Sequence, residues 1–375
     1  MPVAMSLLVR SLVRPEGEVE VALHEAPAPT PGPEEVVVRI DAAPINPSDL
    51  GVLFARADLD TLRATGTAER PALTATIPAA AMAGLGVRVG KALPVGNEGA
   101  GVVVAAGASP TAQALLGRTV GVYGGGMYAQ HRCLPASLCL PLPEGLRAEQ
   151  GASNFVNPMT ALAMLETMRR EGHAGIVHTA AASNLGQMLV KLCAKDGVAL
   201  VNVVRREEQA RALRELGAQH VVDSSAASFE EDLVDALART RATLAFDAIG
   251  GGRLADVILR AMERVATRDA ARYSPYGSTT HKQLYVYGGL DRAATTLSRN
   301  YGMSWGVGGW LVGNTLAKLD AAAVAGLRTR VADELATTFA SRYTKRITLR
   351  ELLDPEVLRG YAKMATGEKY LVVPT

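Results

Sequence analysis

The sequence predicts an α/β protein in two parts, with a small β-barrel followed by a doubly wound parallel sheet. Two patterns carry this prediction. Short apolar strands with Gly/Pro turns occupy the first third of the chain, and strands alternate with helices from about residue 175 onward. The length of 375 residues fits two domains, since one domain commonly has about 150 residues.

The first part is predicted to be mostly β. Strands are expected at 6–14, 19–23, 35–40, 100–105 and 119–123. Alternate prolines over 27–33 hold the chain extended and remove donors from any ladder. Many short strands with such turns are typical of a small barrel. The Ala/Thr-rich stretch 54–93 has no clear period, and there we expect a helix with a mobile loop.

The middle of the chain changes to a β-α alternation. Strands are predicted at 175–180, 198–204, 220–223, 243–248 and 283–287. Helices are predicted at 185–193, 207–216, 229–239 and 254–265. Because the strands are apolar throughout, we expect a parallel sheet covered on both faces. The remainder predicts helices at 322–339 and 355–365 and strands at 347–349 and 369–373.

Composition excludes several classes of protein. With 39 Lys+Arg against 37 Asp+Glu the net charge is +2, which gives no basic surface for nucleic acid. Three cysteines, with no C-x-x-C, favour a reducing compartment. The apolar start is too short for a signal peptide, and no uncharged stretch has the Leu/Ile/Val density of a membrane span. We expect a cytoplasmic protein without nucleic-acid or membrane partners.

A strand, a tight turn and a helix meet around residue 183. The turn is a variant of G-x-G-x-x-G in which Ala and Ser replace the first two glycines. Small residues let the backbone approach a pyrophosphate, and the start of the helix offers N–H groups and a positive dipole end. A tight packing turn is the alternative. The predicted dinucleotide site consists of Ala181, Ser183, Asn184, Leu185 and Gly186.

The residues after the second strand of this part indicate which dinucleotide binds. An acid at this place binds the ribose 2′-hydroxyl of NAD, but Arg205 and Arg206 follow strand 198–204 and no acid comes before Glu207. Arginine suits a 2′-phosphate through forked, charge-assisted hydrogen bonds. We therefore predict NADP(H), with two solvated arginines at a strand end as the alternative.

Six segments spread along the chain form a characteristic set. They are PGPEEVVVR at 31–39, NPSD at 46–49, GNEGAG at 96–101, GMYA at 126–129, NPMTA at 157–161 and FDAIGG at 246–251. Together they resemble the medium-chain dehydrogenase/reductase superfamily, in its zinc-free quinone oxidoreductase and enoyl-thioester reductase branches, and the resemblance covers almost the whole chain. Segments 183–187 and 202–205 are most similar to the enoyl-thioester reductases. That branch uses a tyrosine upstream of G-N-E-G as proton donor, whereas this chain has no tyrosine before Tyr123.

The resemblance implies a GroES-like partial β-barrel domain and a Rossmann doubly wound parallel-sheet domain, with the active site in the cleft between them. We place the GroES-like substrate domain at 1–148 and the Rossmann NADP-binding domain at 149–318. Residues 319–375 are expected to return to the substrate domain. The family often joins the sheets of two subunits at the edge of the cofactor domain, so the resemblance implies a homodimer. Strand 283–287 would be this edge unless another strand follows it.

The zinc-binding branch of this superfamily has Cys in place of Asn46 and His in place of Asn97, together with a Cys-rich loop. Neither zinc site can be built here, so the sequence predicts no metal. Glu98 is expected to bind backbone groups instead. Without a Lewis acid, the expected reaction is hydride transfer to a conjugated acceptor, whose oxygen takes up the negative charge.

The resemblance also suggests individual site residues. Asn46 and Thr160 are expected to face the nicotinamide and its ribose, with a turn role for Asn46 and a helix cap for Thr160 as alternatives. Tyr128 is a candidate donor to a developing oxyanion, or else a buried structural tyrosine. Gly250 and Lys369, which is similar in position to the family's terminal G-K turn, are candidate cofactor contacts.

Three other polar residues are predicted to be structural. Asp49 is expected to fix its loop, Asp247 to hydrogen-bond locally at a strand end, and His178 to be a satisfied core histidine. The stretches 54–93 and 268–281 affect the shape of the pocket, but neither matches a recognisable pattern.

The sequence therefore predicts a zinc-independent, NADPH:quinone oxidoreductase-like enzyme that acts on a small conjugated acceptor, a quinone or an enone. Two alternatives stay open. One is a 2-enoyl-thioester reductase, and the other is an NADPH-binding sensor or structural protein without turnover.

Overall fold

The computed structural model describes residues 5–268 and 272–374, and the chain forms two compact units. Met1–Val156 and Arg328–Thr375 form one, which we call the barrel unit, and Asn157–Leu327 form the other, the sheet unit. The expected boundaries, after residues 148 and 318, lie eight and nine residues before these. Residues 1–4, part of the expectation about a signal peptide, and residues 269–271, part of the stretch 268–281, lie outside the described residues.

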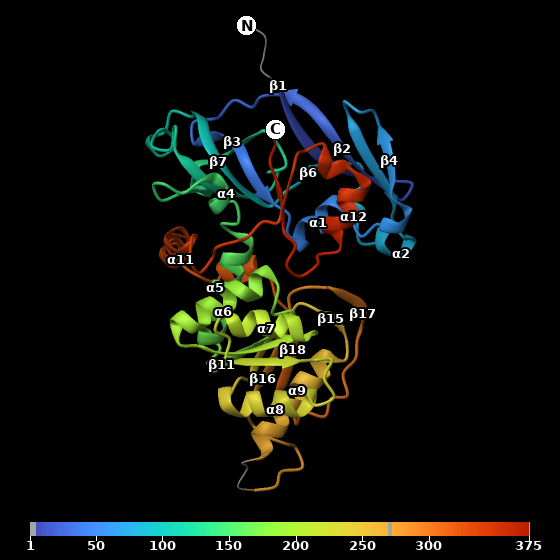
Figure 1. Cartoon of the computed structure of the whole chain (residues 1–375), viewed down its shortest axis with the longest axis vertical. Coiled ribbons are helices and arrows are strands. Elements are labelled where there is room, and N and C mark those ends of the chain that lie inside the picture. The colour runs from blue at the N-terminus through green and yellow to red at the C-terminus, as the bar shows by residue number, and fades with distance from the viewer. Residues whose placement is uncertain (1–4, 269–271, 375) are drawn as a thin grey trace. The chain divides into compact units, whose positions relative to one another are not determined.

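Two sheets build the barrel unit (Figure 1). The order of the first is β4-β5-β2-β1-β6, and that of the second is β10-β8-β7-β3-β20-β19, with β9 also paired to β3. The strands of the first sheet are β1 (Met5–Arg14), β2 (Glu18–Pro27), β4 (Arg63–Gly66), β5 (Pro71–Thr76) and β6 (Ala92–Pro94). Those of the second are β3 (Glu35–Pro44), β7 (Glu98–Ala106), β8 (Thr119–Tyr123), β9 (His131–Pro135), β10 (Cys139–Pro141), β19 (Lys345–Ile347) and β20 (Tyr370–Val372).

Short helices connect these strands. They are α1 (Pro47–Phe54), α2 (Ala79–Met82), α3 (Pro110–Gln113), α4 (Ala148–Gly151) and α12 (Pro355–Ala362). Strand β20 pairs antiparallel with β3, so the end of the chain completes the second sheet of this unit. Strands β19 and β20, near the end of the chain, thus lie in the barrel unit.

The expectation of a helix with a mobile loop over 54–93 is wrong in its central part. Residues 63–76 form the hairpin β4–β5, and β5 lies between β4 and β2. Leu73 and Ala75 of β5 are almost fully buried. Because alanine is depleted in strands, the residues of this segment do not by themselves indicate a strand. Pairing of β5 with β2 holds the segment in its extended conformation.

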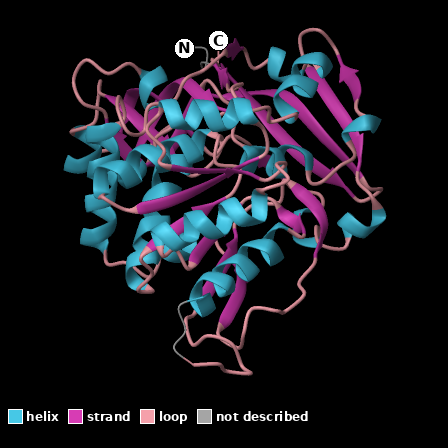
Figure 2. Ribbon diagram, turned by 60° about the horizontal axis from the view of Figure 1, so that its bottom comes forward, coloured by secondary structure: helices cyan, strands magenta, loops and turns pink. Residues whose placement is uncertain are grey.

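The sheet unit contains a six-stranded parallel sheet of order β13-β12-β11-β14-β16-β18. Strands and helices alternate along this part of the chain. Figure 2 distinguishes the two kinds of element by colour, with helices in cyan and strands in magenta. The strands of the sheet are β11 (Gly175–His178), β12 (Ala199–Val204), β13 (His220–Asp223), β14 (Leu244–Asp247), β16 (Lys282–Val286) and β18 (Trp305–Gly309). The chain runs outward from β11 in one direction and then returns to β14 on its other side. In such sheets ligands bind at the carboxyl ends of the strands beside this switch point.

Helices cover both faces of this sheet (Figure 1). The helices in this part of the chain are α5 (Val156–Arg170), α6 (Asn184–Asp196), α7 (Glu207–Glu215), α8 (Phe229–Thr240), α9 (Leu254–Arg268), α10 (Val312–Leu316) and α11 (Ala321–Glu334). Helices α8 and α9 lie on one face, and α5, α6 and α7 lie on the other. Within the described residues, no helix is long and apolar enough to span a membrane.

A sixth strand follows 283–287, so β18 rather than β16 is the edge of the sheet. The sequence analysis missed β18 because its sequence is WGVGG, and glycine weakens strand propensity. Two short strands, β15 (Gly250–Gly252) and β17 (Asp291–Thr295), pair separately. The predicted α/β class, with a barrel followed by a doubly wound sheet, is confirmed.

Candidate functional site

The barrel unit contains a buried polar cluster around Glu98, the first residue of β7. Its Oε2 accepts hydrogen bonds from the backbone N–H groups of Phe155 (2.7 Å) and Val156 (2.9 Å). Its Oε1 accepts from Asn46 Nδ2 at 2.8 Å and from Ser153 Oγ at 3.3 Å. Glu98 is fully buried, and these donors offset the loss of water around its carboxylate. The prediction that Glu98 binds backbone groups is confirmed.

Lys369 completes this cluster from the turn before β20. Its Nζ lies 3.3 Å from Asn46 Oδ1 and 3.2 Å from Ser153 Oγ, and 5.8 Å from the centre of the Tyr343 ring. Burial of the ammonium group lowers the pKa of Lys369 to about 8, although the negative charges of Glu98 and Asp49 act in the opposite direction. The amide of Asn46 thus donates to Glu98 and accepts from Lys369.

Asp49 fixes the loop that carries Asn46. Its Oδ2 accepts from the backbone N–H of Asn46, and its Oδ1 accepts from the backbone N–H of Asn97, both at 2.8 Å. The interpretation of Asp49 as a loop-fixing residue is therefore confirmed. Burial raises its pKa to about 7, against the lowering effect of these two N–H donors. Asn46 also precedes α1 as its N-cap residue, so its predicted turn role and its place in the polar cluster occur together.

The side chains of Tyr128 and Tyr123 both have partners within the barrel unit. Tyr128 is fully buried, and its hydroxyl donates to the carbonyl oxygen of Pro44 at 3.2 Å. That geometry favours the structural alternative for Tyr128. The ring of Tyr123 stacks on Phe155, with centroids 3.8 Å apart, and the Arg328 guanidinium lies 5.3 Å from its centre.

In the sheet unit, the turn between β11 and α6 has the tight geometry expected of a dinucleotide-binding turn. Ser183 is the N-cap of α6, and its hydroxyl accepts from the Gly186 N–H at 3.1 Å. A Cβ at Gly186 would lie 2.0 Å from the carbonyl oxygen of Ala181, so only glycine fits there. Asn184 and Leu185 form the first turn of α6. These residues fit a pyrophosphate at the start of the helix.

Arg205 and Arg206 follow β12 and are both exposed. Neither guanidinium is bonded to another described side chain, whereas Glu207, the first acid after β12, pairs with Arg214 at 3.0 Å. The two arginines are thus available to an anionic group, because the neighbouring Glu207 pairs with Arg214 instead.

The structure places the other predicted cofactor contacts of the sheet unit on α5 and after β14. Thr160 lies within α5 and is nearly buried, so the alternative of a helix cap is wrong. Gly250 follows β14 with φ +81°, a conformation that favours glycine, and its N–H donates to Asp247 at 3.1 Å. Asp247 also accepts from Thr179 and from the Ile249 N–H, so its predicted local role is confirmed.

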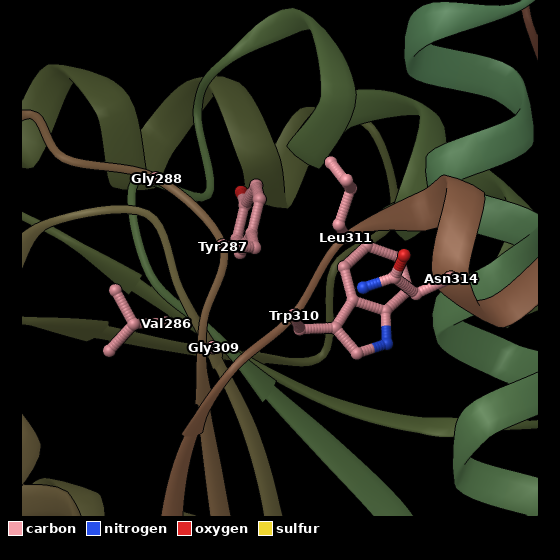
Figure 3. Close-up of a pocket in the computed structure, with 7 residues that line it drawn as sticks. All are labelled: Val286, Tyr287, Gly288, Gly309, Trp310, Leu311 and Asn314. Atoms are coloured by element: carbon pink, nitrogen blue, oxygen red, sulfur yellow. The ribbon is translucent and has the colours of Figure 1, made fainter. Parts of the chain in front are cut away.

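A pocket of about 430 Å³ lies at the carboxyl ends of β16 and β18 (Figure 3). Tyr287, Trp310 and Leu311 contribute side chains to its wall. The Tyr287 hydroxyl lies 2.7 Å from Nε2 of His178, the fully buried last residue of β11. Sequence analysis missed Tyr287, although an aromatic residue just after a parallel strand is a usable signal. It also missed Ser153, for which the sequence offers no signal.

Within the described residues, no group of three or more His, Cys, Asp or Glu side chains is arranged to hold a metal ion. Asn46, Tyr128 and Lys369 belong to the barrel unit. The remaining predicted residues, Thr160, the turn 181–186, the two arginines and Gly250, belong to the sheet unit.

Comparison with known proteins agrees with this architecture. Residues 32–144 match the alcohol dehydrogenase GroES-like domain. The mitochondrial enoyl-[acyl-carrier-protein] reductase of Xenopus tropicalis is 29% identical over 277 residues, which cover 71% of this chain and 65% of that protein. The chain thus spans less than two thirds of that relative's length.

Solved structures share the fold over the whole chain. One from Mesorhizobium loti, assigned as an NADPH:quinone reductase, has a TM-score of 0.73 and 24% identity, covering 100% of this chain and 99% of that one. A mutant enoyl thioester reductase from Candida tropicalis has a TM-score of 0.67 and 18% identity, covering 99% and 100%. The match of residues 32–144 and the shared fold agree with the resemblance to the medium-chain dehydrogenase/reductase superfamily that the sequence motifs indicate.

Proposed function

We propose that the chain is a zinc-independent oxidoreductase that uses NADPH to reduce a small conjugated acceptor, a quinone or an enone. The observation that carries the proposal is the full use of the Asn46 amide, which donates to Glu98 and accepts from Lys369. An amide satisfied in this way is no zinc ligand, and zinc sites are built from Cys, His and carboxylate groups.

The geometry of the sheet unit supports NADP(H) as the cofactor. Ala181 and Gly186 make the close approach that a dinucleotide turn needs, and Ser183 caps the helix behind it. Arg205 and Arg206 are exposed at the position where a 2′-phosphate is recognised. The structurally similar protein from Mesorhizobium loti is assigned as an NADPH:quinone reductase, which agrees with this choice.

The reaction follows from these groups. NADPH, when bound, supplies a hydride to the electrophilic carbon of the acceptor. The electron pair of the conjugated system then moves onto the acceptor oxygen, which takes a proton from water. The chain's part is to bind and orient the reactants, because positioning alone contributes a large share of the barrier reduction for such transfers.

A 2-enoyl-thioester reductase is the second candidate. The turn Ser183–Gln187 and the G-N-E-G segment support it, as does the enoyl reductase relative from Xenopus tropicalis. The absence of a tyrosine upstream of Glu98 counts against it.

The test is NADPH oxidation by the purified protein with a simple quinone, a conjugated enone and a 2-enoyl thioester, each repeated with NADH. We expect turnover with the quinone or enone and little with NADH. Turnover with the thioester alone supports the second candidate. NADPH binding without turnover in any arm supports the sensor alternative and contradicts the proposal.

A pair of variants tests the cofactor assignment. Replacing Arg205 and Arg206 by serine is expected to raise KM for NADPH by about tenfold or more and to leave KM for NADH unchanged, because only NADPH has the 2′-phosphate. Arg211→Ser, at another exposed arginine on α7, is the matched control and should change neither value.

A further inference from the structure

Two polar rings meet at the pocket of the sheet unit, those of the fully buried His178 and the partly exposed Tyr287. His178 ends β11, and Tyr287 follows β16, two strands away in the sheet. Their rings stack with centroids 5.8 Å apart, and the Tyr287 ring also meets Trp310 edge-on. Figure 3 shows Tyr287 in the pocket wall beside Trp310 and Leu311. The phenol therefore joins a buried histidine to the space at the carboxyl ends of the strands.

The direction of the hydrogen bond between the two rings follows from the other nitrogen of His178. Burial lowers the pKa of His178 to about 4, so the ring is neutral at physiological pH and carries a single N–H. Its Nδ1 is buried and has no hydrogen-bond partner among the described residues. An orphaned buried N–H is rarer than an orphaned acceptor, because a lone donor loses its one bond outright.

The proton of His178 consequently belongs on Nε2, which donates to the Tyr287 oxygen at 2.7 Å. The phenol accepts this bond, and its own O–H is left to donate elsewhere. The charge of Asp247 acts on the Tyr287 hydroxyl, but among the described residues no hydrogen bond joins the two, and Asp247 accepts from Thr179, the Ile249 N–H and the Gly250 N–H.

We propose that Tyr287, oriented by His178, donates a hydrogen bond to a carbonyl oxygen of a ligand bound in this pocket. The proposal rests on the proposed function, in which both the nicotinamide carboxamide and the acceptor carry a carbonyl. Burial, aided by the charge of Asp247, raises the pKa of the Tyr287 hydroxyl, so the phenol keeps its proton and acts as a neutral donor. Tyr287 is thus a binding residue, and His178 is the positioning residue behind it.

Tyr287→Phe removes only the hydroxyl and keeps the ring contacts with Trp310. Tyr285→Phe is the matched control, since Tyr285 lies on the same face of β16 but donates to Glu171 at 2.8 Å instead. If the carbonyl belongs to the nicotinamide, Tyr287→Phe weakens NADPH binding by about tenfold and leaves the affinity for 2′-phospho-ADP-ribose unchanged. If it belongs to the acceptor, both affinities stay unchanged and kcat/KM for the acceptor falls by a similar factor.

His178 is tested by two substitutions. His178→Gln keeps an N–H donor near Tyr287 and should stay within about threefold of the wild type, whereas His178→Leu should reproduce most of the loss seen in Tyr287→Phe. Melting temperatures of all variants separate this effect from a loss of folding.

One readout does not depend on NADPH. Nitrogen-15 NMR of the ligand-free protein identifies the His178 tautomer, with His178→Gln providing the assignment. The proposal expects Nε2–H, and Nδ1–H overturns it. Equal effects of Tyr287→Phe and Tyr285→Phe on binding and turnover also overturn it. A wild-type chain with the expected tautomer that neither binds NADPH nor reduces an acceptor contradicts the proposed function instead.

Discussion

Lys369 has an environment unlike that of an ordinary surface lysine. Its ammonium group touches Asn46 and Ser153, and burial lowers its pKa to about 8 from an ordinary value of 10.5. Between these values the folded chain has lost a proton that the unfolded chain still binds. Stability should therefore rise with pH over this range.

Lys369→Met tests this linkage. Urea unfolding at pH 7.5 and pH 10 should show that the wild type gains stability relative to the variant as the pH rises. A constant difference between the two proteins would mean that the lysine has an ordinary pKa.

Gly186 lies where the turn between β11 and α6 has no room for a side chain. Gly186→Ala places a Cβ 2.0 Å from the Ala181 carbonyl oxygen and should cost about 2 kcal/mol or more of unfolding free energy. Gly326→Ala, on α11 with open space around it, is the control and should be neutral or slightly stabilising. Chemical denaturation of both variants gives the comparison, and equal stabilities would contradict the close approach.

At the level of elements, the side chain of Glu98 links β7 to the starts of α1 and α5. One carboxylate joins the start of β7 to Asn46 before α1 and to the backbone at the start of α5. Glu98→Gln replaces an acceptor oxygen by an NH₂ group facing donors, so we expect a loss of about 3 kcal/mol. Glu144→Gln, at an exposed loop position, should stay within about 0.5 kcal/mol of the wild type. A similar midpoint for both variants in urea would argue against this connecting role.

The helices and strands differ in how well the sequence predicts them. The strands and helices of the sheet unit, from β11 to β16, were predictable because apolar runs and helical periodicity are local signals. Strands β5 and β18 were missed, because alanine and glycine carry little strand propensity and both strands depend on neighbours distant in sequence. The turn 181–186 was predictable for the same local reason. Ser153 and the pairing of Tyr287 with His178 were not, since each depends on contacts across the fold.

The whole molecule has a chain whose C-terminal segment packs with its N-terminal segment, because β20 pairs with β3 in the barrel unit. Val372 of β20 is fully buried between β3 and β19 in the barrel unit. Both tryptophans of the chain, Trp305 and Trp310, lie in the sheet unit. Tryptophan fluorescence therefore reports on the sheet unit, and circular dichroism reports on both units.

Val372→Asp should consequently separate the two signals. A buried unpaired carboxylate costs several kcal/mol, about 4 by analogy with other buried charges. The dichroism transition should shift to lower urea while the fluorescence transition stays in place. Val87→Asp, at a side chain that is 85% exposed in the same unit, should shift neither. Equal shifts of both signals in Val372→Asp would show that the two units unfold together.

In the proposed reaction, a hydride passes from NADPH to the carbon of a conjugated acceptor. The most direct measurement uses NADPH deuterated at both positions of nicotinamide C4, with a conjugated enone as acceptor and mass spectrometry of the product. The account predicts one deuterium at the β-carbon, because the electron pair moves to the oxygen and the proton there comes from water. A reduced product without deuterium at that carbon would contradict direct hydride transfer.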